Sequence, residues 1–206
     1  MNRMGKVGTI GLLMAVTVGL SGCNGLLQAL GLRPGNSQAE NSERIGTQSL
    51  NTTDDGNILV NETAGIQITL PASWQEDERL HNSAELQASD PTNNLYIIVL
   101  AEDERALQRF GLRENAETYR NILIRNLQAF EGGDATDVAF VGDNFATQHE
   151  IRGQVQAGTQ VVYLHTTVLT ENRYYQIVAW STPDQYSFSR TELQTITESF
   201  RETSGS

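Results

Sequence analysis

Three histidines are the residues of this chain best suited to metal binding or proton transfer. His81, His149 and His165 do not stand at metal-type spacing from one another, from a cysteine or from a carboxylate pair. His149-Glu150 also lacks the second histidine of a zinc-protease helix, and it lies on an expected strand. Pairing of neighbouring antiparallel strands could bring His149 and His165 together, although tetrahedral zinc needs more than two imidazoles. We therefore treat these two as the candidate metal ligands, expect His165 to be a satisfied, half-buried side chain, and predict neither a bound metal nor a cofactor.

Nucleophile and phosphate-binding motifs are missing from the sequence. It contains no Gly-x-Ser-x-Gly, no Ser-x-x-Lys (Lys6 is the single lysine) and no glycine-rich loop before an expected helix. A carboxylate pair assembled from distant positions would be the remaining route to a hydrolase, because Asp and Glu are abundant. We predict that the protein is not an enzyme.

The single cysteine, Cys23, ends the run Leu20-Ser21-Gly22-Cys23. A basic head with Arg3 and Lys6 and an apolar stretch at 7–20 precede it, and the whole resembles a bacterial lipoprotein signal peptide. In that class the lipobox cysteine receives acyl chains such as palmitate and becomes the first residue of the mature protein. The apolar stretch would rise about 21 Å as a helix, short of the roughly 30 Å hydrocarbon core. The alternative is a buried N-terminal helix, which would need a polar face that this stretch lacks.

The charge balance narrows the class of partner. Removal of residues 1–22 takes away Arg3 and Lys6 and no acid, so the formal charge falls from -11 to -13. Such a surface repels nucleic acid phosphates, so we expect no nucleic acid partner.

The lipid would anchor the chain to the cell membrane or the outer membrane, facing the periplasm or the exterior. Asn24 is not the aspartate of inner-membrane retention, which in a diderm host favours the outer membrane.

Composition divides the chain into four parts. Residues 1–22 are the expected signal peptide, and residues 23–57 are the lipidated cysteine and a flexible linker rich in small polar residues. Residues 58–202 form one domain, long enough to bury its own core, and residues 203–206 are a disordered tail.

Alternating and continuous apolar runs predict strands in this domain. They lie at 66–70, 84–88, 95–100, 136–141, 145–155, 160–170 and 174–181, and short turns make the last four antiparallel neighbours. The continuous run at 95–100 is typical of an interior strand.

Two stretches follow helical spacing instead. The first runs from Asn115, as N-cap, to Phe130 and ends at Gly132-Gly133; the second follows Pro183, with Ser189 and Glu192 as a capping box. In the second helix Leu193, Ile196 and Phe200 share one face. The fold class is therefore α+β, with an antiparallel β-sheet and helices packed on it.

Two segments carry a family resemblance. The opening 65–74, GIQITLPASW, and the close 174–181, YYQIVAWS, followed by Phe188, Leu193 and Ser199-Phe200, resemble the PsbP-like superfamily over about residues 58–202. That family includes DcrB-type bacterial lipoproteins and PsbP-type photosystem II proteins, and the resemblance implies an α/β/α sandwich. The matching residues are core and turn positions, so they indicate the fold and not the activity. We expect Trp74 and Trp180 to pack in the core, with ligand stacking as the alternative.

These observations favour a membrane-anchored lipoprotein of the bacterial envelope that acts as a non-catalytic binding, docking or assembly module. Its expected partners are the membrane, through the N-terminal lipid, and an envelope protein. The alternative is a PsbP-type accessory or assembly protein on the lumenal side of photosystem II, if the host is a cyanobacterium. A carboxylate-based hydrolase is the third and least favoured hypothesis.

Overall fold

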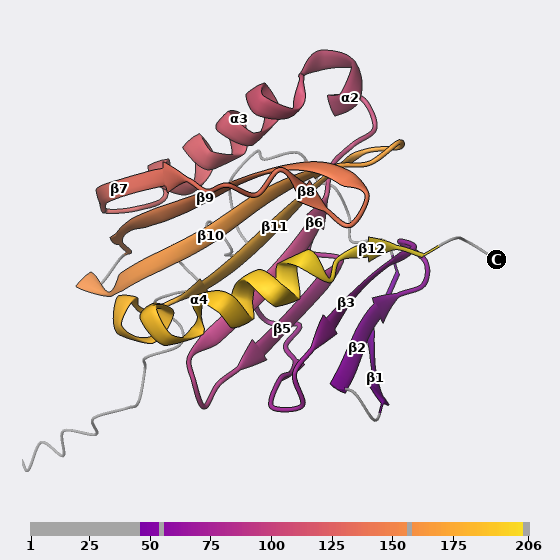
Figure 1. Cartoon of the computed structure of the whole chain (residues 1–206), viewed down its shortest axis with the longest axis horizontal. Coiled ribbons are helices and arrows are strands. Elements are labelled where there is room, and N and C mark those ends of the chain that lie inside the picture. The colour runs from indigo at the N-terminus through magenta and orange to yellow at the C-terminus, as the bar shows by residue number, and fades with distance from the viewer. Residues whose placement is uncertain (1–45, 54–55, 156–157, 204–206) are drawn as a thin grey trace, which may run out of the picture.

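The computed structural model describes residues 46–53, 56–155 and 158–203 (Figure 1). The predicted signal peptide, the lipobox Leu20-Ser21-Gly22-Cys23 and most of the linker lie outside the described residues, as do residues 204–206 of the predicted tail. No helix in the described part is long and apolar enough to span a bilayer.

An eight-stranded antiparallel sheet forms the centre of the molecule. Its order is β4-β5-β6-β11-β10-β9-β7. The eighth strand, β8, is off this path and pairs directly with β9. The strands are β4 (Gln75–Glu76), β5 (Leu86–Asp90), β6 (Leu95–Ala101), β7 (Ala129–Ala135), β8 (Phe140–Val141), β9 (Asn144–Gln154), β10 (Gln160–Leu169) and β11 (Tyr174–Ser181). The predicted strands at 95–100, 145–155, 160–170 and 174–181 are confirmed, and β6 is an interior strand.

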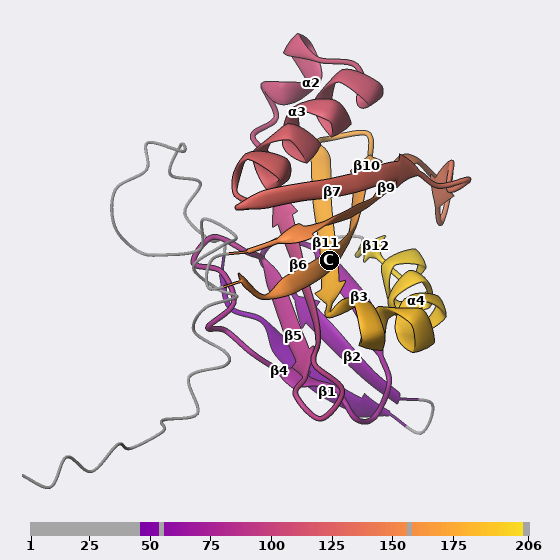
Figure 2. The same cartoon turned by 90° about the vertical axis from the view of Figure 1, so that its left-hand side faces the viewer.

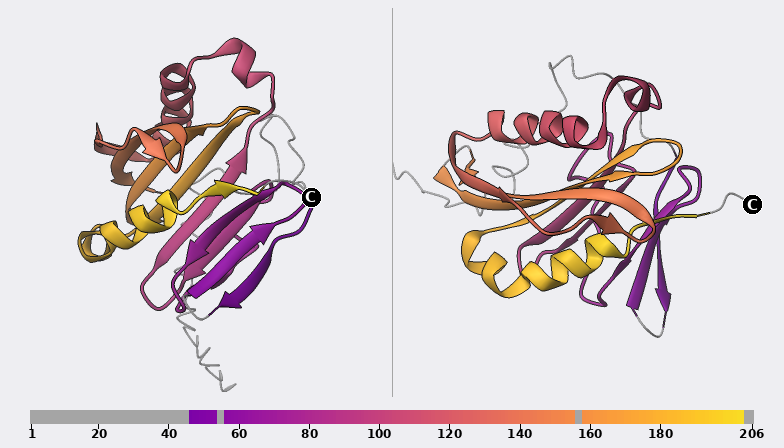
Figure 3. Two further views of the ribbon diagram at one scale, coloured as in Figure 1. Left: turned by 45° about the vertical axis from the view of Figure 1, so that its right-hand side comes forward. Right: turned by 45° about the horizontal axis from the view of Figure 1, so that its top comes forward.

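A second sheet of four strands lies beside the first (Figure 3). Its order is β1 (Ser49–Thr53), β2 (Gly56–Asn61), β3 (Ile66–Leu70) and β12 (Arg201–Glu202), so both ends of the described chain meet in it. Two of these strands begin before residue 58, inside the segment predicted as linker. The edge strand β1 is exposed except at Leu50, which is why its sequence shows no apolar alternation.

Helices cover both faces of the large sheet (Figure 2). After the short α2 (Ala106–Arg109), α3 (Leu112–Arg125) packs on β9 and β10, and α4 (Pro183–Glu198) packs on β10 and β11 from the opposite side. Each helix completes its own apolar cluster, with Leu123 on the α3 side and Leu193 on the α4 side. The α+β class is confirmed.

The predicted first helix is wrong at both ends. Its N-cap is Gly111, and Asn115 is a buried residue inside the helix. The helix ends at Arg125, and Phe130 and the glycine pair belong to strand β7 instead. Gly133 is needed there because a Cβ would approach the carbonyl oxygen of Glu150 to 2.8 Å. A close strand pairing therefore explains Gly133, and Gly132 has a φ of +137° at the register shift of β7, so neither glycine is a helix stop. Of the strand predicted at 136–141 only β8 forms.

The capping box predicted for the second helix is also wrong. The N-cap of α4 is Thr182 with Pro183 in the first turn, and Ser189 is buried within the helix. Proline fixes the backbone angle of the first turn, so the helix can begin two turns earlier than the capping pattern indicated. The face formed by Leu193, Ile196 and Phe200 is buried, as predicted.

Replacement of Trp74 tests how the opening segment is held against α4. The indole Nε1 of Trp74 donates a hydrogen bond to Glu192 Oε1 at 2.8 Å. Trp74 is only 2% exposed. Trp74→Phe should lower the free energy of unfolding by about 2 kcal/mol, because the carboxylate loses a buried donor. Glu192→Gln keeps an acceptor and should cost less. Urea titration measures both, and equal stability of Trp74→Phe and the wild type would contradict the expectation.

Candidate binding site

The two candidate metal ligands do come together. His149 on β9 and His165 on β10 are direct cross-strand partners, with ring centroids 6.4 Å apart. Their predicted proximity is confirmed. Within the described residues, however, no group of three or more His, Cys, Asp or Glu side chains could hold a metal ion. His81 lies apart, in the loop between β4 and β5, where its Nδ1 accepts from the Ser83 amide.

A buried hydrogen-bond network surrounds His165. The amide nitrogen of Gln176 donates to Asn115 Oδ1 at 2.7 Å and to Glu102 Oε1, so its oxygen must be the acceptor on the other side. That oxygen accepts from the Thr167 hydroxyl at 2.7 Å and lies 2.8 Å from His165 Nε2. The proton of a neutral His165 therefore sits on Nε2, because an acceptor faces that atom.

His165 is fully buried and not half-buried as predicted, and it is only partly satisfied, because its Nδ1 has no hydrogen-bond partner within the described residues. Burial lowers its pKa to about 4, against the opposing effect of the Gln176 hydrogen bond, and Tyr119 of α3 stacks over the ring at 5.1 Å. Burial and the charge of Arg120 also lower the pKa of His149, partly opposed by Glu117. Both imidazoles are thus neutral near neutral pH. The arrangement joins α3 to the sheet and keeps His165 away from solvent.

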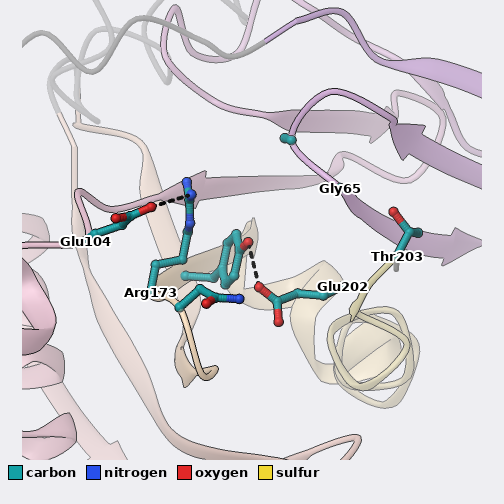
Figure 4. Close-up of a pocket in the computed structure, with 8 residues that line it drawn as sticks. Gly65, Glu104, Arg173, Glu202 and Thr203 are labelled. Carbon is teal, nitrogen blue, oxygen red and sulfur yellow. Dashed lines mark hydrogen bonds and ion pairs between the residues drawn. The ribbon is translucent and has the colours of Figure 1, made fainter. Parts of the chain in front are cut away.

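A pocket of about 390 Å³ lies between the β2–β3 turn, the β10–β11 turn and β12 (Figure 4). Four chain segments line it, and the lining residues are Ala64, Gly65, Glu104, Asn172, Arg173, Tyr175, Glu202 and Thr203. Arg173 forms an ion pair with Glu104 at 3.5 Å, and the Tyr175 hydroxyl donates to Glu202 at 3.0 Å. The pocket therefore has opposite charges on its walls.

An exposed aromatic pair lies close to this end of the sheet. Phe140 and Phe145 flank the β8–β9 turn, are 53% and 60% exposed, and have ring centroids 5.1 Å apart. Phe145 pairs with Leu169, the residue before the β10–β11 turn that carries Arg173. A third exposed phenylalanine, Phe188, stands on α4. Exposed aromatics are enriched where proteins contact one another.

The sequence predicted some of these positions and missed others. Trp74 and Trp180 are buried as predicted, and Trp180 stacks on Tyr96 with centroids 5.3 Å apart. The pocket was missed, since its residues are far apart in sequence. The aromatic pair could have been found, because a two-residue turn at Gly142 places Phe140 opposite Phe145.

Comparison with known protein families and with curated protein sequences finds no match. Among solved structures, cyanobacterial PsbP (CyanoP) from Synechocystis sp. PCC 6803 is similar with a TM-score of 0.50 at 10% identity, over 82% of this chain and 98% of that chain. The fold is PsbP-like.

Two further structures match with TM-scores of 0.44. LpqN, involved in cell envelope biogenesis of Mycobacterium tuberculosis, is 17% identical over 77% of this chain and 91% of that chain. PA94 of Pseudomonas aeruginosa, a protein of unknown function and putative regulator, is 11% identical over 74% of this chain and 95% of that chain. At these identities the likeness concerns the fold.

The buried imidazoles predict a pH dependence of stability. Burial lowers the pKa of His165 and of His81 to about 4, below the usual 6.5, so the unfolded chain binds more protons between these values. The free energy of unfolding should therefore fall as the pH drops from 6.5 toward 4, by up to roughly 3 kcal/mol for the fully buried His165.

Urea titrations at several pH values measure this dependence. His165→Gln and His81→Gln should each flatten it, since each removes one of the two groups. If the free energy of unfolding depended on pH in both variants as it does in the wild type, the lowered pKa values of His81 and His165 would be contradicted.

Proposed function

We propose that this chain is a lipid-anchored, non-catalytic docking module of a bacterial envelope, which helps a partner protein to assemble or to stay in place. The observation that carries the proposal is the exposed Phe140–Phe145 pair at the end of the sheet. Burial of two adjacent aromatic rings against a partner would remove apolar surface from water, which is the main driving force of association.

The buried network supports a role without catalysis. His165 and Gln176 are fully buried, and each meets other protein side chains in hydrogen bonds. A general acid or base must reach the proton that it transfers. These groups instead stabilise the contact between α3 and the sheet, which leaves the outer surface as the place for recognition.

The acidic composition favours a protein over a lipid surface as the occupant of the aromatic pair. The chain carries a formal charge of -11, which repels anionic headgroups. Attachment to the membrane would then depend on the acyl chains at Cys23, and the aromatic pair would be left to contact protein. The domain would face the periplasm or the exterior.

Site-specific photocrosslinking in membranes of the native host tests the docking surface. A photoreactive amino acid at position 140 or 145 should give a discrete protein adduct, while position 188 on α4, where the phenylalanine is even more exposed, serves as the control. Phe140→Ser combined with Phe145→Ser should abolish the partner's co-purification, and Phe188→Ser should not. Adducts to lipid alone, or equal adducts at all three positions, would overturn the proposal.

Replacement of Cys23 tests the anchor. The wild-type protein should fractionate with membranes and yield an acylated N-terminal cysteine by mass spectrometry. Cys23→Ser should lose the acylated N-terminal cysteine and keep residues 1–22, because the lipobox cysteine is both the residue that receives the acyl chains and the first residue after processing. Ser21→Ala retains a small residue and the cysteine, so it should stay with membranes. An unacylated Cys23 in the membrane-bound wild-type protein would refute lipid anchoring.

A PsbP-type accessory role at photosystem II is the second candidate. It is favoured by the likeness to CyanoP, which extends over 98% of that chain. Purified photosystem II from a photosynthetic host should then contain the protein in wild-type cells and lose it after the double phenylalanine replacement. Absence of the protein from photosystem II would remove this candidate without touching the general docking role.

A further inference from the structure

The pocket beside Arg173 and Glu202 is assembled from segments that are distant in sequence (Figure 4). Gly65 comes from the β2–β3 turn, Glu104 follows β6, Arg173 ends the β10–β11 turn, and Glu202 belongs to β12. Its volume of about 390 Å³ lies within the usual range of small-molecule sites, about 300–1,000 Å³. The pocket is therefore large enough for a small polar molecule.

Arg173 supplies the positive wall. Its side chain is 23% exposed, and its ion pair with Glu104 spans 3.5 Å, longer than the roughly 2.7–2.9 Å of a strong charge-assisted hydrogen bond. Glu104 is 73% exposed, so it can turn into water at small cost. A guanidinium has five donors in a planar fork that matches a carboxylate. Arg173 can therefore exchange Glu104 for the carboxylate of a ligand.

Glu202 supplies the negative wall. Its Oε1 accepts from the hydroxyls of Tyr175 at 3.0 Å and Thr170 at 3.1 Å. Burial and the charge of Glu202 raise the pKa of Tyr175, which keeps that phenol protonated and donating. Two neutral hydroxyls hold the carboxylate in position without neutralising it. An ammonium group that entered the pocket would meet a fixed anion.

We propose that this pocket binds a small zwitterion of the amino-acid class, with its carboxylate on Arg173 and its ammonium group on Glu202. A simple anion would be attracted by Arg173 but repelled by Glu104 and Glu202. A simple cation would be attracted by Glu104 and Glu202 but repelled by Arg173. A molecule that carries both charges can contact both walls at once, and its binding is a function separate from docking through the phenylalanines.

Amide chemical shifts of the mature full-length chain, recorded in detergent micelles, test the proposal. Glycine should shift the amide signals of Gly65, Asn172 and Thr203 saturably. Acetate and methylamine, which each carry one of the two charges, should bind at least about tenfold more weakly, because one charge-assisted contact is lost. Equal binding of acetate and glycine, or no shift with glycine, would overturn the proposal.

Three variants and one control sharpen the test. Arg173→Gln and Glu202→Gln should weaken glycine binding, and Glu104→Gln should strengthen it, because the competing carboxylate of Arg173 is removed. Arg201→Gln changes an exposed neighbour of Glu202 outside the pocket and should leave the affinity unchanged. Glu104 is largely exposed, so its variant should fold in any case. Unchanged or weaker binding by Glu104→Gln would overturn the assignment of Arg173.

Discussion

Burial of the large sheet on both faces is the constraint from which the other features of this protein follow. All eight residues of β11 are buried, since this central strand lies between β6 and β10 in a sheet with α3 on one side and α4 on the other. A polar side chain on such a strand must find its hydrogen bonds inside the protein. Gln176 does so with Asn115 of α3 and Thr167 of β10, so one amide ties a helix to two strands.

The same constraint explains why the histidines are unsuited to surface chemistry. Paired strands place His149 beside His165, and α3 then covers His165 with the ring of Tyr119. An imidazole in that position is neutral and oriented by Gln176, as a structural residue should be. Groups that can meet another molecule are found instead where the strands end, at the aromatic pair and at the pocket around Arg173. Strand ends and turns are commonly where a rigid sheet carries its recognition residues.

Local pattern was sufficient for much of the fold. The central strands were predicted because β-branched and aromatic residues follow one another between clear turns. The sequence pattern gave wrong helix ends where a residue type is compatible with two different structural roles. Gly133 looks like a helix stop, but it permits close approach of β7 to Glu150; Ser189 looks like an N-cap, but it is buried within a helix that Pro183 begins earlier. The exposed strand β1 has no alternation to detect, so its residues resembled a linker.

The sequence by itself determined the α+β class, most of the central strands, the burial of Trp74 and Trp180, and the lipobox pattern at Cys23 that predicts a lipid anchor. These depend on periodicity and on short motifs, which are local properties of the chain. Tertiary structure decided that His165 is enclosed, that Asn115 bonds to Gln176, and that Arg173 and Glu202 share a pocket. Those contacts join residues 29 to 61 positions apart, and no local rule specifies which distant partner a polar side chain will meet.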